Sequence, residues 1–353
     1  MRMAGTNRIE SSTVRLLRSL CWLIAFVCCS GAAAGTLPLQ VAKRIEIAGA
    51  DPVQAIASGP GGLQVYVASE REIRVYDVAS GRLAGTLPLP SPVVDMTVDA
   101  SGGVGYAALT APARVVVFGL QPLRIRSTMA LTDGTPSTLL LDAAAHALYV
   151  ESSASGSLAR FDTSSGKRVA ALRLDGTLQQ MATDGRGTLY VANMNHNAID
   201  TVDTARMIRT SAIPLQDCTQ PVGLAMDPVG RRLFVACRDG DRAVVDTDMG
   251  FTFESLHGEV PGVVRTVFGF HPFGAGGWKG GAFSAGKGLQ LTAIRMNAFI
   301  NYSAAGSYPL HGTCQALALD SAGHGLWLAV AQSSGSGAPV QLWLLGETAG
   351  ASK

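Results

Sequence analysis

Histidine and carboxylate side chains are the first residues in this chain that could carry out chemistry. His196, His257 and His311, together with Glu259, are able to bind a metal ion because imidazole and carboxylate groups are ordinary ligands. They come from distant parts of the chain, and no ligand spacing such as HExxH joins them. Solvated loop residues are the better interpretation, so we predict no metal site and no cofactor.

Motifs of known catalytic machinery are missing as well. The sequence has no GxSxG elbow for a nucleophilic serine, no Walker loop for a nucleotide and no CxxCH haem attachment site. No catalytic residue can be named on this basis. The sequence therefore favours a protein that is not an enzyme.

The distribution of charge argues against two classes of partner. Lys and Arg number 28 against 26 Asp and Glu, which gives a net charge of +2, and they are scattered without a basic run. Nucleic acids and anionic membrane surfaces attract clustered positive charge. We therefore expect no nucleic acid partner.

The elements that must position the polar residues follow a repeat. The stretches LYVANMNHNAIDTVDT (189–204) and LFVACRDGDRAVVDTD (233–248) are two copies of one unit about 44 residues apart. Such a period is typical of a propeller or a solenoid. Related central strands recur at intervals of about 40 to 50 residues, at 65–69, 105–109, 148–152, 189–193, 233–237, 282–285 and 326–331. The sequence thus predicts seven repeats.

Aspartates and glycines mark the turns of each repeat. The third strand of a repeat usually ends in Asp, and that Asp opens turns such as DVASG (77–81) and DTSSG (162–166). A second class of turn joins the first two strands, as in DASGG (99–103) and DPVG (227–230). Asp accepts hydrogen bonds from turn amides and Gly supplies a positive φ. Each repeat therefore folds into four short antiparallel strands.

A ring is the arrangement that buries such sheets. One four-stranded sheet cannot cover its own faces, whereas stacking seven of them radially does so and leaves only short edges. The last repeat lacks an outer strand, and residues 37–47 can supply it. We predict an all-β, seven-bladed β-propeller of four-stranded antiparallel blades, closed by the N-terminal strand joining the last blade, with residues 35–348 as a single domain.

The repeat resembles the YVTN-type β-propeller family, which includes YncE-like periplasmic proteins. The stretches VYVAS (65–69), LYVAN (189–193) and LFVAC (233–237) carry the resemblance, each followed by a polar turn and a strand that ends in Asp. The resemblance covers most of residues 37–345 and implies the fold more specifically than the function. Two repeats depart from it: Gly119 stands where Asp is expected, and 257–310 contains either an irregular blade or an elaborated loop.

Residues 1–34 are expected to be a signal peptide. Arginines precede the apolar stretch LCWLIAFVCC (20–29), which is too short to span a bilayer comfortably. Ala32-Ala33-Ala34 then satisfies signal peptidase, so we predict cleavage after Ala34; the alternative is an uncleaved anchor. The mature protein is expected to be periplasmic or secreted and monomeric, with no membrane span after cleavage and a disordered tail at 349–353.

Three cysteines remain after that cleavage. Cys218 precedes one strand and Cys237 ends its antiparallel neighbour, so both are expected at the same end of one blade. An oxidising compartment allows one disulfide between them and leaves Cys314 as a free thiol. The alternative is three buried thiols that act as small hydrophobic side chains.

The loops that precede each inner strand, and those between the second and third strands, meet on one face of a propeller. We call this the loop face, and we expect ligands there because concave shape and convergent polar groups coincide. The side chains that we predict to bind a ligand on it are Glu70, Arg71, Glu151, Asn193, Asn195, His196, Gln220, Arg238, Asp239, His257, Glu259 and His311.

Two classes of function fit this arrangement. The favoured one is a non-catalytic binding or scaffold module for a protein, peptide or envelope ligand. The alternative is a lactonase-like hydrolase or an accessory subunit of a periplasmic oxidoreductase, in which histidine and glutamate side chains of the loop face would act as acid, base or ligand.

Overall fold

A computed structural model describes residues 36–47, 49, 52–257, 263–270, 281–286, 290–296, 302–323, 325–332 and 339–348. The predicted signal peptide (1–34) and C-terminal tail (349–353) lie outside these residues. None of the described helical segments is both long and apolar enough to cross a membrane.

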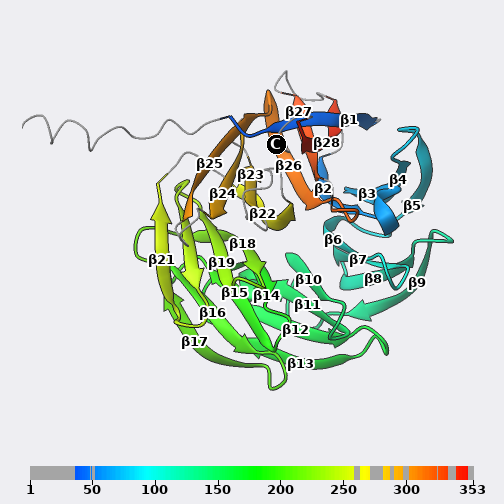
Figure 1. Cartoon of the computed structure of the whole chain (residues 1–353). Helices are drawn as coiled ribbons and strands as arrows, with labels where there is room; N and C mark the ends of the chain where they lie inside the picture. The colour runs from blue at the N-terminus through cyan, green and yellow to red at the C-terminus, as the bar shows by residue number, and fades with distance from the viewer. Residues whose placement is uncertain are drawn as a thin grey trace, which may run out of the picture. The chain divides into compact units, whose positions relative to one another are not determined.

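The strands of the described residues form seven four-stranded antiparallel sheets, which confirms the predicted fold (Figure 1). We number these sheets as blades one to seven along the chain. Blade one contains β2 (Val53–Ser58), β3 (Gln64–Ser69), β4 (Glu72–Asp77) and β5 (Leu83–Pro88). Blade two contains β6 (Val93–Asp99), β7 (Val104–Thr110), β8 (Ala113–Gly119) and β9 (Arg124–Ala130). Blade three contains β10 (Thr138–Asp142), β11 (Ala147–Ser152), β12 (Ser157–Asp162) and β13 (Arg168–Arg173).

The remaining blades repeat the same order. Blade four contains β14 (Leu178–Thr183), β15 (Thr188–Asn193), β16 (Ala198–Asp203) and β17 (Ile208–Pro214). Blade five contains β18 (Pro221–Asp227), β19 (Arg232–Cys237), β20 (Arg242–Asp246) and β21 (Phe251–Leu256). Blade six contains β22 (Val263–Phe270), β23 (Gly281–Gly286), β24 (Gln290–Met296) and β25 (Tyr302–Pro309). Short 3-10 turns lie at η1 (Pro60–Gly62) and η2 (Ser153–Ser155).

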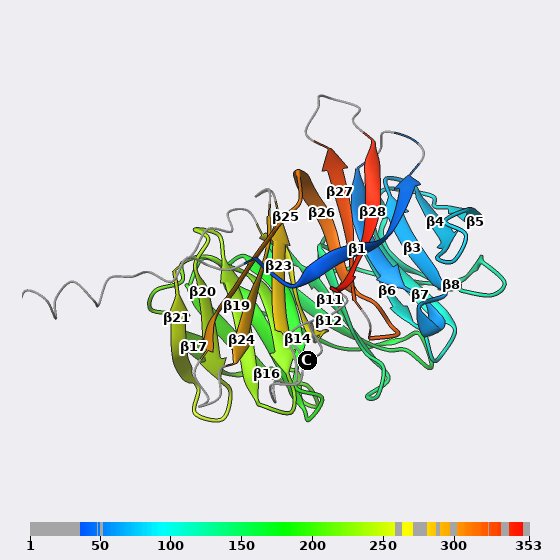
Figure 2. The ribbon, with the colours of Figure 1, turned by 45° about the horizontal axis from the view of Figure 1, so that its top comes forward.

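Blade seven is closed by the N-terminal strand, as the sequence predicts. Strand β1 (Leu39–Ile47) pairs antiparallel with β28 (Val340–Glu347), and the sheet continues through β27 (Leu326–Gln332) to β26 (Gly312–Leu319). Figure 2 shows β1 lying across the outer side of this blade. Because the inner strand β26 also packs against β2 of blade one, the seven blades close into a ring.

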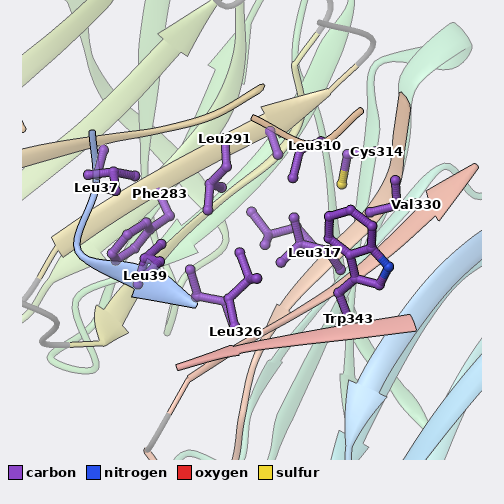
Figure 3. Close-up of a cluster of buried hydrophobic side chains, with 14 residues drawn as sticks. Leu37, Leu39, Phe283, Leu291, Leu310, Cys314, Leu317, Leu326, Val330 and Trp343 are labelled. Atoms are coloured by element: carbon purple, nitrogen blue, oxygen red, sulfur yellow. The ribbon is translucent and has the colours of Figure 1, made fainter. Parts of the chain in front are cut away.

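Apolar side chains between neighbouring blades form the core. Between blades six and seven, Leu39, Phe283, Leu317 and Trp343 are buried in one cluster (Figure 3). Burying each large apolar side chain stabilises the fold by about 2 kcal/mol. The second strand of each blade is apolar because neighbouring blades cover both of its faces.

The two repeats that depart from the pattern still form complete blades. Blade six has all four strands, with register shifts in β22, and the connection 271–280 lies outside the described residues. In blade two, a Cβ at Gly119 would lie 2.8 Å from the carbonyl oxygen of Pro122. Glycine is needed at this turn because the backbone approaches closely, which explains why the expected Asp is missing.

The aspartate turns behave as the sequence predicts. Asp77 Oδ1 accepts hydrogen bonds from Ser80 N at 2.7 Å and Ser80 Oγ at 2.6 Å, and Asp162 does the same with Ser165 N and Oγ, both at 2.7 Å. These turns lie at the face opposite the loop face. The hydrogen bonds that these carboxylates accept lie within the turns, so they stabilise the turns themselves.

Candidate functional site

The first strands of the seven blades line a central channel, and they begin at the loop face. Six of them carry a register shift within their opening residues, for example between Val53 and Ala55 in β2 and between Cys314 and Ala316 in β26. A bulge of this kind redirects a side chain and is frequent beside functional sites. In β2 and β26 the inserted residues are Gln54 and Gln315.

A cavity of about 270 Å³ lies in the channel at this end. Its polar side chains come from five blades, and they are Gln54, Asp95, Ser137, Thr138, Arg265 and Gln315. Its apolar wall consists of Ala55, Ile56, Val94, Ala316 and Leu317. Side chains from several blades converge here because each inner strand points its opening residues toward the common axis.

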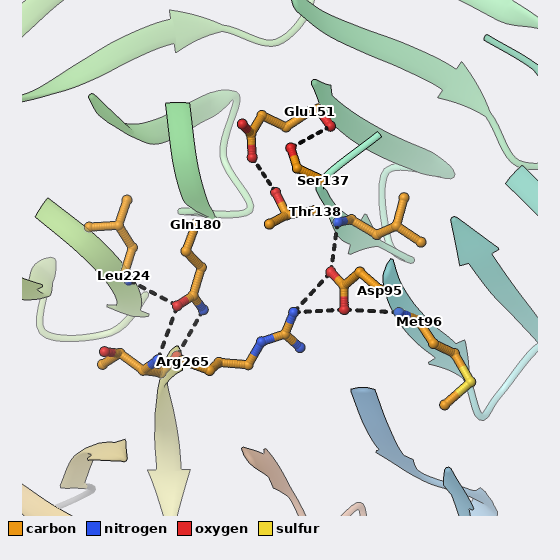
Figure 4. Close-up of polar contacts among 10 residues, drawn as sticks. Asp95, Met96, Ser137, Thr138, Glu151, Gln180, Leu224 and Arg265 are labelled. Atoms are coloured by element: carbon orange, nitrogen blue, oxygen red, sulfur yellow. Dashed lines mark hydrogen bonds and ion pairs between the residues drawn. The ribbon is translucent and has the colours of Figure 1, made fainter. Parts of the chain in front are cut away.

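An ion pair spans the channel beside this cavity. Arg265 of β22 reaches from blade six to Asp95 of β6 in blade two, with Nη2 at 3.0 Å from Oδ1 and 2.9 Å from Oδ2 (Figure 4). Asp95 is buried and also accepts hydrogen bonds from the backbone N–H groups of Met96 and Leu139, both at 2.8 Å. Charge-assisted hydrogen bonds of this kind hold both side chains in fixed positions.

Gln180 of β14 joins blades four and five to blade six. Its Oε1 accepts hydrogen bonds from the backbone N–H groups of Leu224 at 3.2 Å and Thr266 at 3.0 Å, and its Nε2 donates to the Thr266 carbonyl at 2.9 Å. Gln180 therefore hydrogen-bonds to the backbone of Thr266, the residue that directly follows Arg265 (Figure 4). The position of Arg265 is fixed by these contacts as well as by Asp95.

Glu151 is buried behind the cavity and not exposed on a loop, which corrects the expected position of this side chain. It lies at the end of β11 with none of its surface exposed, and Thr138 Oγ1 donates to its Oε2 at 2.5 Å. Its Oε1 has no hydrogen-bond partner among the described residues. Burial, with a smaller contribution from the Asp95 charge, raises the pKa of Glu151 to about 7.

Asn193 is likewise buried, at the end of β15, and is not exposed on the loop face as expected. Its Nδ2 donates to the Asp175 carbonyl at 2.6 Å and to Asp200 Oδ2 at 2.8 Å, and the side chain has no exposed surface. A Cβ at Gly176 would lie 2.3 Å from its Oδ1. Asn193 therefore holds the loop that precedes β14.

The other predicted residues within the described chain are exposed on the loop face. They are Glu70, Arg71, Asn195, His196, Gln220, Arg238, Asp239, His257 and His311. Arg71 donates to the Pro90 carbonyl at 2.9 Å, and Asp239 Oδ2 accepts from Thr219 Oγ1 at 2.6 Å. Glu259 lies outside the described residues. None of the exposed side chains named above is among those that line the cavity.

The histidines of the loop face have separate surroundings. His257 Nδ1 lies 3.1 Å from Asp241 Oδ2, and this hydrogen bond raises the pKa of the exposed imidazole. His196 Nδ1 lies 3.2 Å from Asn193 Nδ2. Within the described ranges, no three His, Cys, Asp or Glu side chains are grouped in a way that could hold a metal ion.

A disulfide joins Cys218 and Cys237 at the loop-face end of blade five. Their Cα atoms are 5.5 Å apart, and both side chains are fully buried. It ties the segment before β18 to the end of β19, next to the loop that carries Arg238 and Asp239. Cys314 is a buried free thiol, and burial raises its pKa to about 12.

Sequence reasoning missed the channel residues Gln54, Asp95, Gln180 and Arg265. A usable signal was present for Asp95, because PVVDMTV (92–98) places a charged residue inside an otherwise apolar inner strand. The partner of Asp95 is 170 positions away, and no local pattern identifies it. The loops were predicted from their composition, whereas the cavity arises from tertiary structure.

Solved structures similar to this chain are β-propellers. One is described as "Crystal structure of RRP9 WD40 repeats", with a TM-score of 0.71, 14% identity, and coverage of 87% of this chain and 99% of that one. Another is described as "Structure of U3-55K", with a TM-score of 0.70, 13% identity, and coverage of 87% and 98%. At this identity the similarity shows the fold alone. No protein-family model matches the chain, and no curated protein matches it.

Proposed function

We propose that this chain is an exported propeller of the YVTN type, and that it acts as a non-catalytic binding module. A protein or peptide partner would dock on the loop face and insert a polar group into the channel mouth. The observation that carries the proposal is the cavity of about 270 Å³, whose polar side chains converge from five blades at that face. Concave sites with a few converging polar groups are the usual form of a ligand site.

The surroundings of the cavity support docking at this end. Exposed polar residues such as His196, Gln220 and Arg238 lie on the same face, and the disulfide Cys218–Cys237 limits movement of the blade-five loop there. A pre-ordered surface loses less conformational entropy when a partner binds. A rigid ring with a polar depression at one end is therefore suited to recognition.

The disulfide also supports export. Disulfides persist in oxidising compartments and are rare in the cytosol. Together with the basic, apolar and small-residue regions of residues 1–34, the Cys218–Cys237 bond favours a periplasmic or secreted protein. Export can be tested by measuring the mass of the chain recovered from the periplasm, where loss of residues 1–34 is expected.

One observation favours the hydrolase alternative. A carboxyl group with a pKa of about 7, as Glu151 has, is suited to act as a general acid or base near neutral pH. However, Glu151 does not line the cavity, and Thr138 lies between the two. A catalytic role would require Glu151 to reach a substrate, so loss of a lactonase activity in Glu151→Gln would support this alternative.

Photocrosslinking from two positions in blade four tests the binding proposal. A photoreactive amino acid replaces His196 on the loop face or, as the matched control, the exposed Arg206 in the turn at the opposite face. We expect a covalent adduct of one discrete mass from position 196 and none from position 206. Equal labelling from both positions, or none from position 196, would contradict a partner on the loop face.

A further inference from the structure

The unused hydrogen-bonding groups of the cavity are mainly donors. Asp95 is the only carboxylate that lines it among the described residues, and both of its oxygens already accept two hydrogen bonds each. Thr138 donates its hydroxyl hydrogen to Glu151, and Ser137 donates its own to the Glu151 carbonyl. Apart from the amide oxygen of Gln54, the cavity therefore offers little acceptor capacity to a ligand.

Arg265 provides the strongest of the unused donors. Only its Nη2 contacts Asp95, while Nη1 and Nε make no hydrogen bond to the described part of the chain. The side chain keeps 26% of its surface exposed, although it is fixed at its far end by the ion pair. A guanidinium with unpaired N–H groups in a cavity is suited to a planar, negatively charged acceptor.

Two glutamines add neutral donors on neighbouring strands. Gln315 Oε1 accepts a hydrogen bond from Val53 N at 2.8 Å, so its Nε2 is the end that remains for a ligand. Gln54 is the inserted residue of the β2 bulge, is exposed, and makes no hydrogen bond to the described residues. Both amides line the same cavity as Arg265.

The charge of the site limits the charge of its ligand. Among the residues that the structure describes, one cation, Arg265, and one anion, Asp95, line the cavity, and the buried Glu151 lies behind Thr138. A doubly charged phosphate would meet the Asp95 carboxylate with only one guanidinium to compensate it. A single negative charge matches this balance better, and the volume of about 270 Å³ limits the ligand to a small group.

We propose that this cavity binds a carboxylate group, held by Arg265 Nη1 with the side-chain amides of Gln315 and Gln54. This inference rests on the binding function proposed above and names the chemical group that the module recognises. The carboxylate belongs either to the end of a peptide chain or to a small free acid. Both sources present the same acceptor geometry to Arg265.

Calorimetric titration of the purified protein with defined probes tests the proposal. The probes are N-acetyl-alanyl-alanine, its C-terminal amide, propionate and inorganic phosphate. We expect the peptide acid to bind at least about tenfold more tightly than its amide, since a hydrogen bond to a charged group contributes about this factor. Propionate binding as tightly as the peptide acid would identify a small free acid as the source, and much weaker binding would identify a chain end.

Substitution of Gln315 separates recognition from folding. Gln315→Glu keeps an oxygen that accepts from Val53 N but replaces the donor by an acceptor, so we expect at least about a tenfold loss of peptide-acid affinity without loss of the fold. Gln54→Ala should lower the affinity by a smaller factor. Gln121→Glu is the matched control, because Gln121 is exposed in the turn between β8 and β9, far from the inner strands.

Several outcomes would overturn the carboxylate proposal. They are equal binding of acid and amide, tighter binding of phosphate than of the acid, unchanged affinity in Gln315→Glu, and no binding of any carboxylate by the wild-type protein. The last outcome, together with a discrete adduct from position 196, would reject the carboxylate and leave the proposed partner on the loop face. Absence of that adduct would reject the binding function itself.

Discussion

Polar side chains serve different purposes at the two ends of the propeller. At the opposite face, Asp77 and Asp162 accept hydrogen bonds from backbone and hydroxyl groups three residues away. At the loop-face end of the channel, Asp95 is held by Arg265, which is 170 positions away, and the cavity beside them retains unused donors. The first set stabilises turns, whereas the second set leaves groups available for a ligand.

Replacing one arginine at each end should give the largest difference in stability between the two ends. Arg265→Leu would leave Asp95 buried without its cation, and we expect it to lower the free energy of unfolding by about 3 kcal/mol. Arg206→Leu, at the opposite face, removes an exposed ion pair with Asp203 and should cost at most about 0.5 kcal/mol. Denaturant unfolding of both variants measures the difference.

A double variant shows whether the loss in Arg265→Leu comes from the unpaired charge. Adding Asp95→Asn removes the buried negative charge while leaving an oxygen that can accept from Leu139 N, so part of the stability should return. Equal destabilisation by the Arg265 and Arg206 substitutions would contradict the distinction between the two ends.

The next largest effect on the free energy of unfolding should come from the protonation of Glu151. Its pKa is raised to about 7 from 4.5, so the folded chain binds a proton that the unfolded chain has already lost, and stability should fall as the pH rises from about 4.5 to 7. The difference corresponds to about 3 kcal/mol at most. Glu151→Gln should remove this slope from the unfolding free energies measured between pH 4.5 and 8.

A second glutamate provides the control for that measurement. Glu254 lies partly exposed on the outer strand β21, and Glu254→Gln should leave the slope of the wild type in place. A wild-type profile that is flat between pH 4.5 and 7 would contradict the buried, protonated state of Glu151.

The smallest effect on stability is expected from the aspartate turns. Hydrogen bonds from Ser80 and Ser165 lower the pKa values of Asp77 and Asp162 below their ordinary value. Their contribution to stability is therefore present above pH 4 and is lost as the pH falls through the lowered pKa values. Asp77→Asn and Asp162→Asn keep the acceptor but cannot titrate, so together they should reduce the loss of stability between pH 4 and 2. An unchanged acid profile would contradict this role.

The fold could be predicted because its determinants are local and repeated. Each central strand, such as 189–193 or 233–237, is apolar over most of its length, and the aspartate turns recur at a similar distance from it. Even closure of the ring could be inferred, since the last repeat lacks one strand and residues 37–47 supply it.

The site could be predicted only in part. The exposed residues His196 and Arg238 follow from polar loops between recognisable strands, so their face was correctly identified. The burial of Glu151 and Asn193 could not be predicted from the sequence. Both residues lie at the ends of mainly apolar strands, and the loops that cover them belong to other parts of the chain. The pairing of Asp95 with Arg265 depends on which blades face each other across the channel, and local sequence does not specify this.

The most direct test of the account maps where a carboxylate ligand binds. Methyl groups of Ala55, Ile56, Val94, Ala316 and Leu317 line the cavity, whereas those of Leu63, Val229 and Met249 are exposed in turns of the opposite face. Titration of the methyl-labelled protein with N-acetyl-alanyl-alanine should shift the first set of NMR signals and leave the second set unchanged. Shifts in the second set, or none in the first, would contradict a carboxylate site at the mouth of the channel.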